Sequence, residues 1–175
     1  NFENDQFRFG FAKFIAIDGV KIWTQRLSYV GELGYELYVD LKDAKKIYEL
    51  LIEKGKDFNL SNCGMHAMDI MRMESGFLHW GHDISPEENQ YQAGLAFTIS
   101  NKKDIDFIGK QALEKIKQDK VKTRFSMFTL KESEPGKPLL LHDEPIYDGE
   151  KIIGKSTSGN YSFNFKKNLV FGYIN

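Results

Sequence analysis

The pattern of the sequence changes after Lys122, and this change limits the folds that the chain can adopt. Before it, short alternating runs and stretches of helical spacing follow one another. After it come only short β-type runs, separated by Gly, Pro and Asp turns: "TRFSMFTL", "KPLLLHD", "EPIYDGEKIIGKSTSG" and "NLVFGYI". This order predicts an α+β fold, with a mixed domain over residues 1–120 and a small β-barrel domain from residue 121 to 175.

The first part of the chain predicts one hairpin, one further strand and three helices. The turn Asp18-Gly19 between "FAKFIAI" and "KIWTQRLSYV" is typical of a two-residue β-hairpin. A second hairpin turn, Asp148-Gly149, is predicted in the β-rich part. The other predictions are a strand over Glu32 to Leu41 and helices over 43–55, with Gly55 as C-cap, over 64–76 and over 108–120.

Charge and composition exclude several classes of partner. The net charge is -1, and the basic residues are spread along the chain rather than gathered on one arm, so no nucleic-acid partner is expected. The apolar runs are only a few residues long, so no membrane partner is expected either. A single cysteine, Cys63, suits a reducing compartment, and the cytoplasm is the expected location.

Both ends of the sequence predict a piece of a longer polypeptide. The chain starts at Asn1 without a methionine and stops in the alternating apolar run "LVFGYIN". A strand that ended there would leave part of a core uncovered.

The stretch "SYVGELGYELYVDL" combines a strand pattern with glutamates. In a strand over Glu32 to Leu41, Glu32 and Glu36 would share one face, which is solvent in most strands. The other face would supply the core through Leu33, Tyr35, Leu37 and Val39. Two glycines, Gly31 and Gly34, would let another group approach the backbone closely.

The tyrosines in the same stretch change what Glu36 can do. Tyr29, Tyr35 and Tyr38 place flat rings with polar tips close to this acid. A carboxylate among aromatic rings needs hydrogen-bond donors. A planar group with two adjacent N–H donors, such as the edge of a 2-amino-4-oxopteridine, would match Glu36 with bidentate, charge-assisted hydrogen bonds.

Two other polar groups have structural interpretations. "HWGHD" holds the metal-ligand types His79, His82 and Asp83, but the spacing matches no zinc motif, so no metal is expected and these side chains are predicted to hydrogen-bond within a loop. Arg72 is predicted to pair with Asp69, one helical turn earlier.

Several motifs together resemble one protein family. They are "LSYVGELGYELYV", "GMHAMDIMRMESGFLHWGHDISPEENQYQAGLAFTI", "FIGKQALEKIK" and "GKSTSGNYSFNFKKNLVFGYI". The chain resembles the aminomethyltransferases, the folate-binding T proteins of glycine cleavage. It looks most like the tetrahydrofolate-binding C-terminal half of the dimethylglycine and sarcosine dehydrogenases. The resemblance implies the second half of the folate-binding domain over 1–120, followed by an incomplete C-terminal β-barrel over 121–175.

The resemblance also assigns site residues. Glu36 matches the glutamate that holds the pteridine, Leu37 and Tyr38 follow it in the same site, and Tyr29 matches a folate-contacting tyrosine of the dehydrogenase branch. Phe97 falls near another aromatic folate contact, often a tyrosine in the family. The T proteins bind folate with an arginine where this chain has Met68, a departure shared with the dehydrogenase branch. The catalytic aspartate of the family lies upstream of Asn1, so no residue of this chain is predicted to be catalytic.

The implied function is tetrahydrofolate-dependent one-carbon transfer. The partners would be folate and a one-carbon unit released from a small N-methyl amine. FAD would be bound only by a separate dehydrogenase domain of the same polypeptide. The alternatives are a folate-binding module without catalysis and a scaffolding domain.

Overall fold

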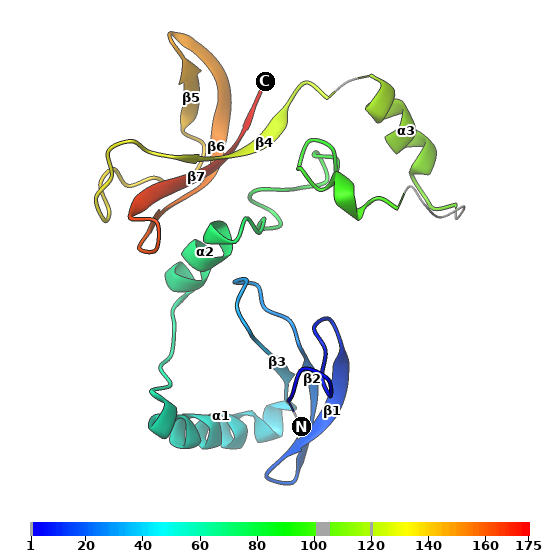
Figure 1. Cartoon of the computed structure of the whole chain (residues 1–175), viewed down its shortest axis with the longest axis vertical. Helices are drawn as coiled ribbons and strands as arrows, with labels where there is room; N and C mark the ends of the chain where they lie inside the picture. The colour runs from blue at the N-terminus through cyan, green and yellow to red at the C-terminus, as the bar shows by residue number, and fades with distance from the viewer. Residues whose placement is uncertain (1, 101–105, 120) are drawn as a thin grey trace. The chain divides into compact units, whose positions relative to one another are not determined.

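The computed structural model describes residues 2–100, 106–119 and 121–175. The chain divides into two compact units, Asn1–Ser75 and Gly76–Asn175, which are described separately below (Figure 1). Helices and antiparallel sheets occur side by side in the sequence, so the predicted α+β class is confirmed. None of the helices in the described ranges combines the length and apolar character that a bilayer span requires.

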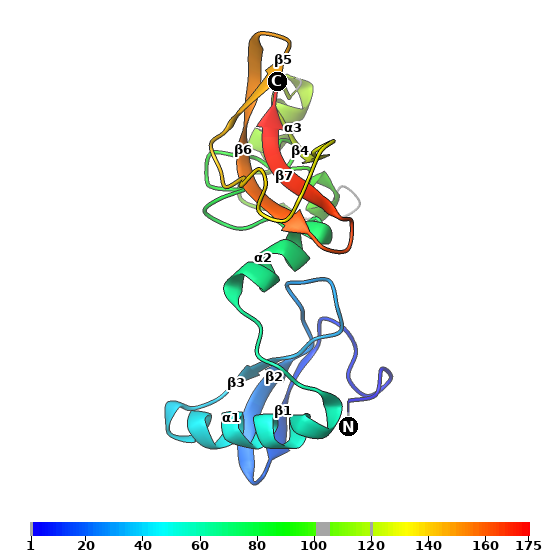
Figure 2. The same cartoon turned by 90° about the vertical axis from the view of Figure 1, so that its left-hand side faces the viewer.

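The first unit is a three-stranded antiparallel sheet followed by two helices. The strands β1 (Ala12–Ile17), β2 (Val20–Gln25) and β3 (Glu36–Tyr38) pair in the order β1-β2-β3. The helices are α1 (Leu41–Gly55) and α2 (Met65–Glu74), with a short 3-10 turn at Lys56–Phe58 between them. Figures 1 and 2 show α1 running alongside the sheet.

The predicted hairpin forms between β1 and β2. Asp18 and Gly19 both have positive φ, 47° and 77°, as a tight two-residue hairpin turn requires. Lys46 of α1 then donates to the Asp18 carbonyl at 3.1 Å and pairs with its carboxylate at 2.8 Å. The turn is therefore connected to the helix that follows the sheet.

The two faces of this sheet differ sharply in burial. Ile22 and Thr24, which alternate along β2, are fully buried, and Ile47 of α1 is buried as well. The side chains between them on β2 point to the other, more open face. This alternation gives the sheet one core face and one accessible face.

The predicted strand over Glu32 to Leu41 is wrong except at its centre. Only Glu36–Tyr38 pair with β2. Leu33, predicted to face the core, is 72% exposed, and Glu32 lies outside the strand, so it does not share a face with Glu36.

The glycines explain why pairing starts late. Gly31 has a φ of 76° and turns the chain so tightly that an added Cβ would lie 2.2 Å from Ser75 Oγ. Ser75 Oγ donates to the Val30 carbonyl at 2.9 Å. At Gly34 an added Cβ would lie 3.0 Å from Ser28 Cβ. The groups that approach these glycines belong to the chain itself.

The helix α2 carries the predicted ion pair. The Arg72 side chain is 1% exposed, and its Nε and Nη2 donate to Asp69 Oδ1 at 2.9 Å and 2.7 Å. This confirms the pairing predicted from the spacing.

The second unit contains a long loop, one helix and a four-stranded antiparallel sheet. The strands pair in the order β4-β7-β6-β5. They are β4 (Arg124–Thr129), β5 (Pro145–Asp148), β6 (Lys151–Ser162) and β7 (Lys167–Ile174), preceded by a 3-10 turn at Ala96–Thr98 and by α3 (Lys110–Gln118). The predicted Asp148-Gly149 turn does join β5 to β6, and Gly149 has a φ of 61°.

The core of this unit is built around β7. Leu169 and Phe171 are essentially buried, and Val170 between them is also buried, so both faces of this inner strand are covered. Phe125 of β4 packs edge-to-face on Phe171, with 5.0 Å between ring centroids.

The run "KPLLLHD" does not form the predicted strand. Residues 137–143 follow an irregular path in which Leu139 is 71% and Leu141 56% exposed. Asp143 has a φ of 64°, which is incompatible with an extended strand. The apolar run therefore lies over the sheet as a loop, with the Leu140 side chain close to Gly159.

Candidate functional site

The accessible face of the first sheet is organised by its pairing register. Gln25 stands opposite Glu36, and Trp23 stands opposite Tyr38. Because successive side chains of a strand point to opposite faces, Glu36 and Tyr38 share a face. Phe14 of β1 stands opposite Trp23 and therefore continues the line of side chains that runs from Tyr38 through Trp23. We refer to Phe14, Trp23 and Tyr38 as the aromatic row.

The aromatic row is open to solvent. Phe14 is 57% and Tyr38 is 53% exposed, and Trp23 is half-buried between them. The Phe14 and Trp23 rings pack edge-to-face, with centroids 4.8 Å apart and an interplanar angle of 62°. Contiguous exposed rings of this kind are typical of binding surfaces.

Glu36 lies next to the aromatic row and is held by it. The Tyr38 hydroxyl donates to Glu36 Oε2 at 2.7 Å. This hydrogen bond, and then the charge of Glu36, raises the pKa of Tyr38 above its ordinary value. Each carboxylate oxygen accepts about two hydrogen bonds, so an exposed Glu36 retains capacity for two further donors.

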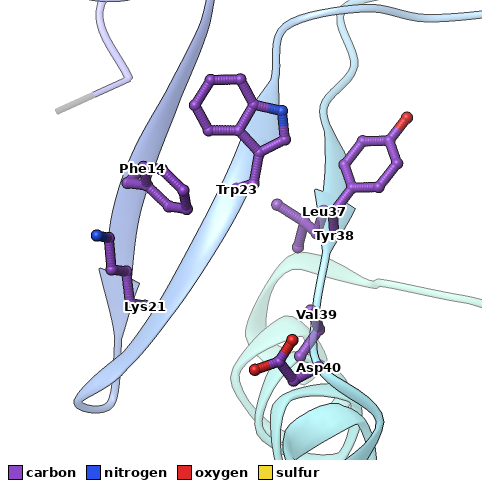
Figure 3. Close-up of a pocket in the computed structure, with 7 residues that line it drawn as sticks. All are labelled: Phe14, Lys21, Trp23, Leu37, Tyr38, Val39 and Asp40. Atoms are coloured by element: carbon purple, nitrogen blue, oxygen red, sulfur yellow. The ribbon is translucent and has the colours of Figure 1, made fainter.

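A hollow of about 660 Å³ lies beside the aromatic row (Figure 3). It opens where β3 ends, because β3 pairs with β2 over three residues only and the chain then leaves for α1. Lys21 contributes a positive charge, with Nζ 4.1 Å from the Phe14 ring centroid. The volume falls within the range of small-molecule sites, roughly 300–1,000 Å³. The lining residues are Phe14, Lys21, Trp23, Leu37, Tyr38, Val39 and Asp40.

The structure brings three of the five predicted site residues together. Glu36, Leu37 and Tyr38 make up β3, and the last two line the hollow. Tyr29 lies in the loop before the strand, half-buried and outside the lining of the hollow. Phe97 belongs to the second compact unit, on the 3-10 turn, where it is 83% exposed.

Sequence reasoning missed Phe14, Lys21 and Trp23. A signal for two of them was present, because a two-residue turn at Asp18-Gly19 fixes the register and places Phe14 opposite Trp23. Their position beside Tyr38 depends on the pairing of β2 with β3, which no local pattern specifies.

A second polar cluster surrounds Asp83 in the second unit. Asp83 is 1% exposed and accepts from the His79 backbone N–H at 2.9 Å. Its other oxygen accepts from Thr157 Oγ1 at 2.5 Å and from Ser158 Oγ at 2.7 Å. The Tyr173 hydroxyl donates to the Asp83 carbonyl at 2.8 Å. For the Asp83 side chain the predicted hydrogen bonding within "HWGHD" is confirmed, and Asp83 also ties this loop to β6 and β7.

Three histidines lie near this cluster. The ring centroids of His79 and His82 are 4.5 Å apart, and those of His82 and His142 are 6.4 Å apart. Within residues 2–100, 106–119 and 121–175, no group of three or more His, Cys, Asp or Glu side chains is arranged to hold a metal ion. His142 Nδ1 instead pairs with Asp143, 2.8 Å away.

Comparison with protein-family models gives two matches in the chain. Residues 1–103 match the GCVT N-terminal domain, and residues 124–175 match the glycine cleavage T-protein C-terminal barrel domain. The second match covers the strands β4 to β7, so the antiparallel sheet of the second unit corresponds to that barrel domain.

Curated relatives are both oxidising enzymes and transferases. Human mitochondrial dimethylglycine dehydrogenase is 34% identical over 98% of this chain and 19% of its own length. The formaldehyde-forming 4-methylaminobutanoate oxidase of Paenarthrobacter nicotinovorans is 39% identical over 88% of this chain and 18% of its own length. The aminomethyltransferase of Symbiobacterium thermophilum is 33% identical over 95% of this chain and 44% of its own length. The chain thus spans about a fifth of the oxidising relatives and less than half of the transferase.

A solved structure has the same fold. It is the crystal structure of glycine cleavage system aminomethyltransferase T from Bartonella henselae, with a TM-score of 0.83 over 98% of this chain and 46% of that one. The identity is 22%, so this likeness concerns the fold alone. With its two consecutive domain matches and its curated relatives, the chain belongs to the glycine cleavage T-protein family.

Proposed function

We propose that the chain is the tetrahydrofolate-binding part of a one-carbon transferase. The intact protein takes up a methylene unit from an oxidised N-methyl amine and forms 5,10-methylenetetrahydrofolate. Tetrahydrofolate supplies the nitrogen atoms that accept this unit. A separate domain of the same polypeptide binds FAD and oxidises the amine.

The observation that carries the proposal is the setting of Glu36. Its carboxylate lies on an open sheet face, one oxygen is fixed by the Tyr38 hydroxyl, and aromatic rings lie alongside. A pteridine presents a ring N–H and an exocyclic amine side by side, and these two donors match one carboxylate. The exposed rings of Phe14 and Trp23 offer surfaces on which a flat ring of the ligand stacks.

The hollow also suits a ligand of this kind. Its volume of about 660 Å³ accommodates a molecule of folate size, and its lining combines apolar side chains with a few charged groups. The volume of the hollow and the acceptor oxygens of Glu36 beside it therefore support tetrahydrofolate as the ligand.

The names of the relatives support the amine chemistry. Two are named for the oxidation of dimethylglycine and of 4-methylaminobutanoate, and a third for aminomethyl transfer. The first two compounds share an N-methyl amine and a carboxylate. We infer that the intact protein acts on an amine of this class.

In this proposal Glu36 binds and orients the pterin and transfers no proton. The exposed carboxylate offers oxygen atoms that accept hydrogen bonds from the ligand. The resemblance to the family implies that the catalytic aspartate of the intact protein is not among these residues. The proposed domains are residues 1–120, the folate-binding part, and residues 121–175, the barrel.

The proposed location is the cytoplasm, on the basis of the single cysteine. Relatives with mitochondrial names show that members of the family also work elsewhere.

The alternative function is a folate-binding or scaffolding module without catalysis. It predicts that the intact protein turns over no N-methyl amine, whatever its affinity for folate.

The test is a calorimetric titration of the intact protein with tetrahydrofolate, beside the variants Glu36→Ala and Glu36→Gln. Loss of a bidentate charged contact weakens binding by about 2–4 kcal/mol, or roughly 30- to 1000-fold, in Glu36→Ala. Glu32→Gln is the matched control, because Glu32 is exposed in the preceding loop. Tetrahydrofolate binding that is indifferent to Glu36 would contradict the proposed site and leave the scaffolding alternative.

A further inference from the structure

The accessible face of the first sheet carries charge of opposite sign at its two ends. Glu36 stands opposite Gln25 on β2. Lys21 lies four residues before Gln25 on the same strand, so its side chain points to the same face. Between these ends lies the aromatic row, because Trp23 is halfway from Lys21 to Gln25.

The spacing of the two charged ends follows from strand geometry. Four residues of an antiparallel strand span about 13 Å. A ligand that reaches from Glu36 to Lys21 is therefore elongated, and its middle lies over Trp23 and Phe14. Its first end must donate hydrogen bonds, and its far end must be an anion.

Lys21 is available to such an anion. Its side chain is exposed, and its ammonium lies over the Phe14 ring, 4.1 Å from the centroid. Within the part of the chain that the structure describes, no carboxylate lies in ion-pair distance of Lys21. The contact with an aromatic face holds the charge beside the hollow without neutralising it.

Asp40 is the second charged group that lines the hollow. It precedes α1 as the N-cap residue, and its side chain makes no capping hydrogen bond. Figure 3 shows the Asp40 carboxylate below Leu37 and Tyr38. The negative charge of Asp40 would therefore repel an anion bound by Lys21. The site thus offers one positive and one negative residue for substitution.

From this arrangement we propose that Lys21 binds the carboxylates of the glutamate tail of folate. The inference rests on the proposed function, because it takes the pterin to be held by Glu36. The p-aminobenzoyl group then lies over Phe14 and Trp23. Lys21 thus makes the site selective for a folate with an anionic tail over a pterin that lacks one.

The experiment compares two ligands of nearly the same shape, one with an anionic tail and one with a neutral tail. They are tetrahydrofolate and its diamide, in which both glutamate carboxylates are amidated. Calorimetry on the intact protein gives both dissociation constants for the wild type and for Lys21→Met, Asp40→Asn and Glu36→Gln. Lys45→Met is the control, because Lys45 is an exposed lysine of α1 outside the hollow.

The expected result has opposite signs at the two charged residues. Lys21→Met weakens the binding of tetrahydrofolate about two- to fivefold, as expected for the loss of an exposed ion pair, and leaves the binding of the diamide unchanged. Asp40→Asn strengthens the binding of tetrahydrofolate by a smaller factor, and Lys45→Met changes the affinity for neither ligand. The advantage of tetrahydrofolate over the diamide also shrinks when the salt concentration is raised, because exposed charges are screened.

The failures of the two proposals are distinguishable. If Glu36→Gln weakens the binding of both ligands and Lys21→Met weakens the binding of neither, the pterin site stands and the role of Lys21 is overturned. Equal weakening of both ligands by Lys21→Met would also overturn it, since that is the result of altered packing beside Phe14. If Glu36→Gln changes neither ligand, the proposed function itself fails.

Discussion

At the scale of single residues, the first unit contains a buried hydroxyl that works against its stability. Thr24 is fully buried on the core face of β2, and its Oγ1 has no hydrogen-bond partner among the residues that the structure describes. Taking a hydroxyl out of water without a partner costs about 1–3 kcal/mol. Valine has the same shape and no such cost.

Thr24→Val is therefore expected to stabilise the first unit by about 1 kcal/mol, which raises the unfolding temperature of this unit by about 4–8 °C. Scanning calorimetry measures the shift. Thr157→Val is the contrasting variant, because Thr157 Oγ1 donates to Asp83 and its loss is destabilising. A lower unfolding temperature for Thr24→Val would show that its hydroxyl is satisfied in solution.

The buried phenol of Tyr173 is expected to make the second unit less stable at alkaline pH. Burial, followed by the charges of Glu88 and Asp83, raises the pKa of this phenol far above its ordinary value. The native state then keeps a proton that the unfolded chain loses above about pH 10, so stability is intact below that pH and falls as the pH rises further. Tyr173→Phe is expected to lower the stability by about 1 kcal/mol at pH 7. Above pH 10 the stability of the variant is expected to fall less steeply than that of the wild type.

Denaturant unfolding at pH 8 and at pH 10.5 tests this expectation. Tyr147→Phe is the control, because Tyr147 is 55% exposed in the same unit. The explanation would be wrong if wild type and Tyr173→Phe lost the same stability between the two pH values.

At the scale of elements, Asp83 connects a loop to two strands. Through Asp83 the segment around His79–Ile84 is bonded to β6 by Thr157 and Ser158 and to β7 by Tyr173. In Asp83→Ala the buried hydroxyls of Thr157 and Ser158 lose their acceptor, while the hydrogen bond from Tyr173 to the backbone carbonyl remains, and the expected destabilisation is about 3 kcal/mol. Hydrogen exchange of the amides in β6 should accelerate accordingly.

Asp83→Asn is expected to have a smaller effect, because an amide oxygen in place of Oδ1 still accepts from both hydroxyls and only the hydrogen bond from the His79 N–H is lost. Asp119→Ala, at an exposed position after α3, serves as the control. Unchanged exchange in β6 of Asp83→Ala would mean that the loop is held by other contacts.

Elements specified by neighbouring residues could be predicted from the sequence. The hairpin at Asp18-Gly19 formed as expected because both turn residues tolerate positive φ, and the Asp69–Arg72 pair formed because three residues separate its members on one helix. The strand over Glu32 to Leu41 could not be delimited in this way. Its early residues alternate well, yet the turn at Gly31 and its contact with Ser75 keep Leu33 away from the sheet.

At the scale of the whole molecule, the candidate site is a product of pairing between separate segments. The sequence predicted Glu36, Leu37 and Tyr38 as site residues, but the residues beside them on the sheet come from β1 and β2. Nothing local indicates that Trp23 meets Tyr38, and nothing local brings Asp83 to Thr157, since these contacts join distant positions. Two family domains follow one another in the chain, and each supplies one antiparallel sheet.

The central claim is that a pterin binds on the accessible face of β1–β3 with its N–H edge at Glu36. The most direct measurement is a crystal structure of the intact protein with tetrahydrofolate bound. The expected result is a pteridine whose ring N–H and exocyclic amine each lie about 3 Å from the Glu36 carboxylate, with its ring system beside the aromatic row. A pteridine bound away from Glu36 would contradict the account.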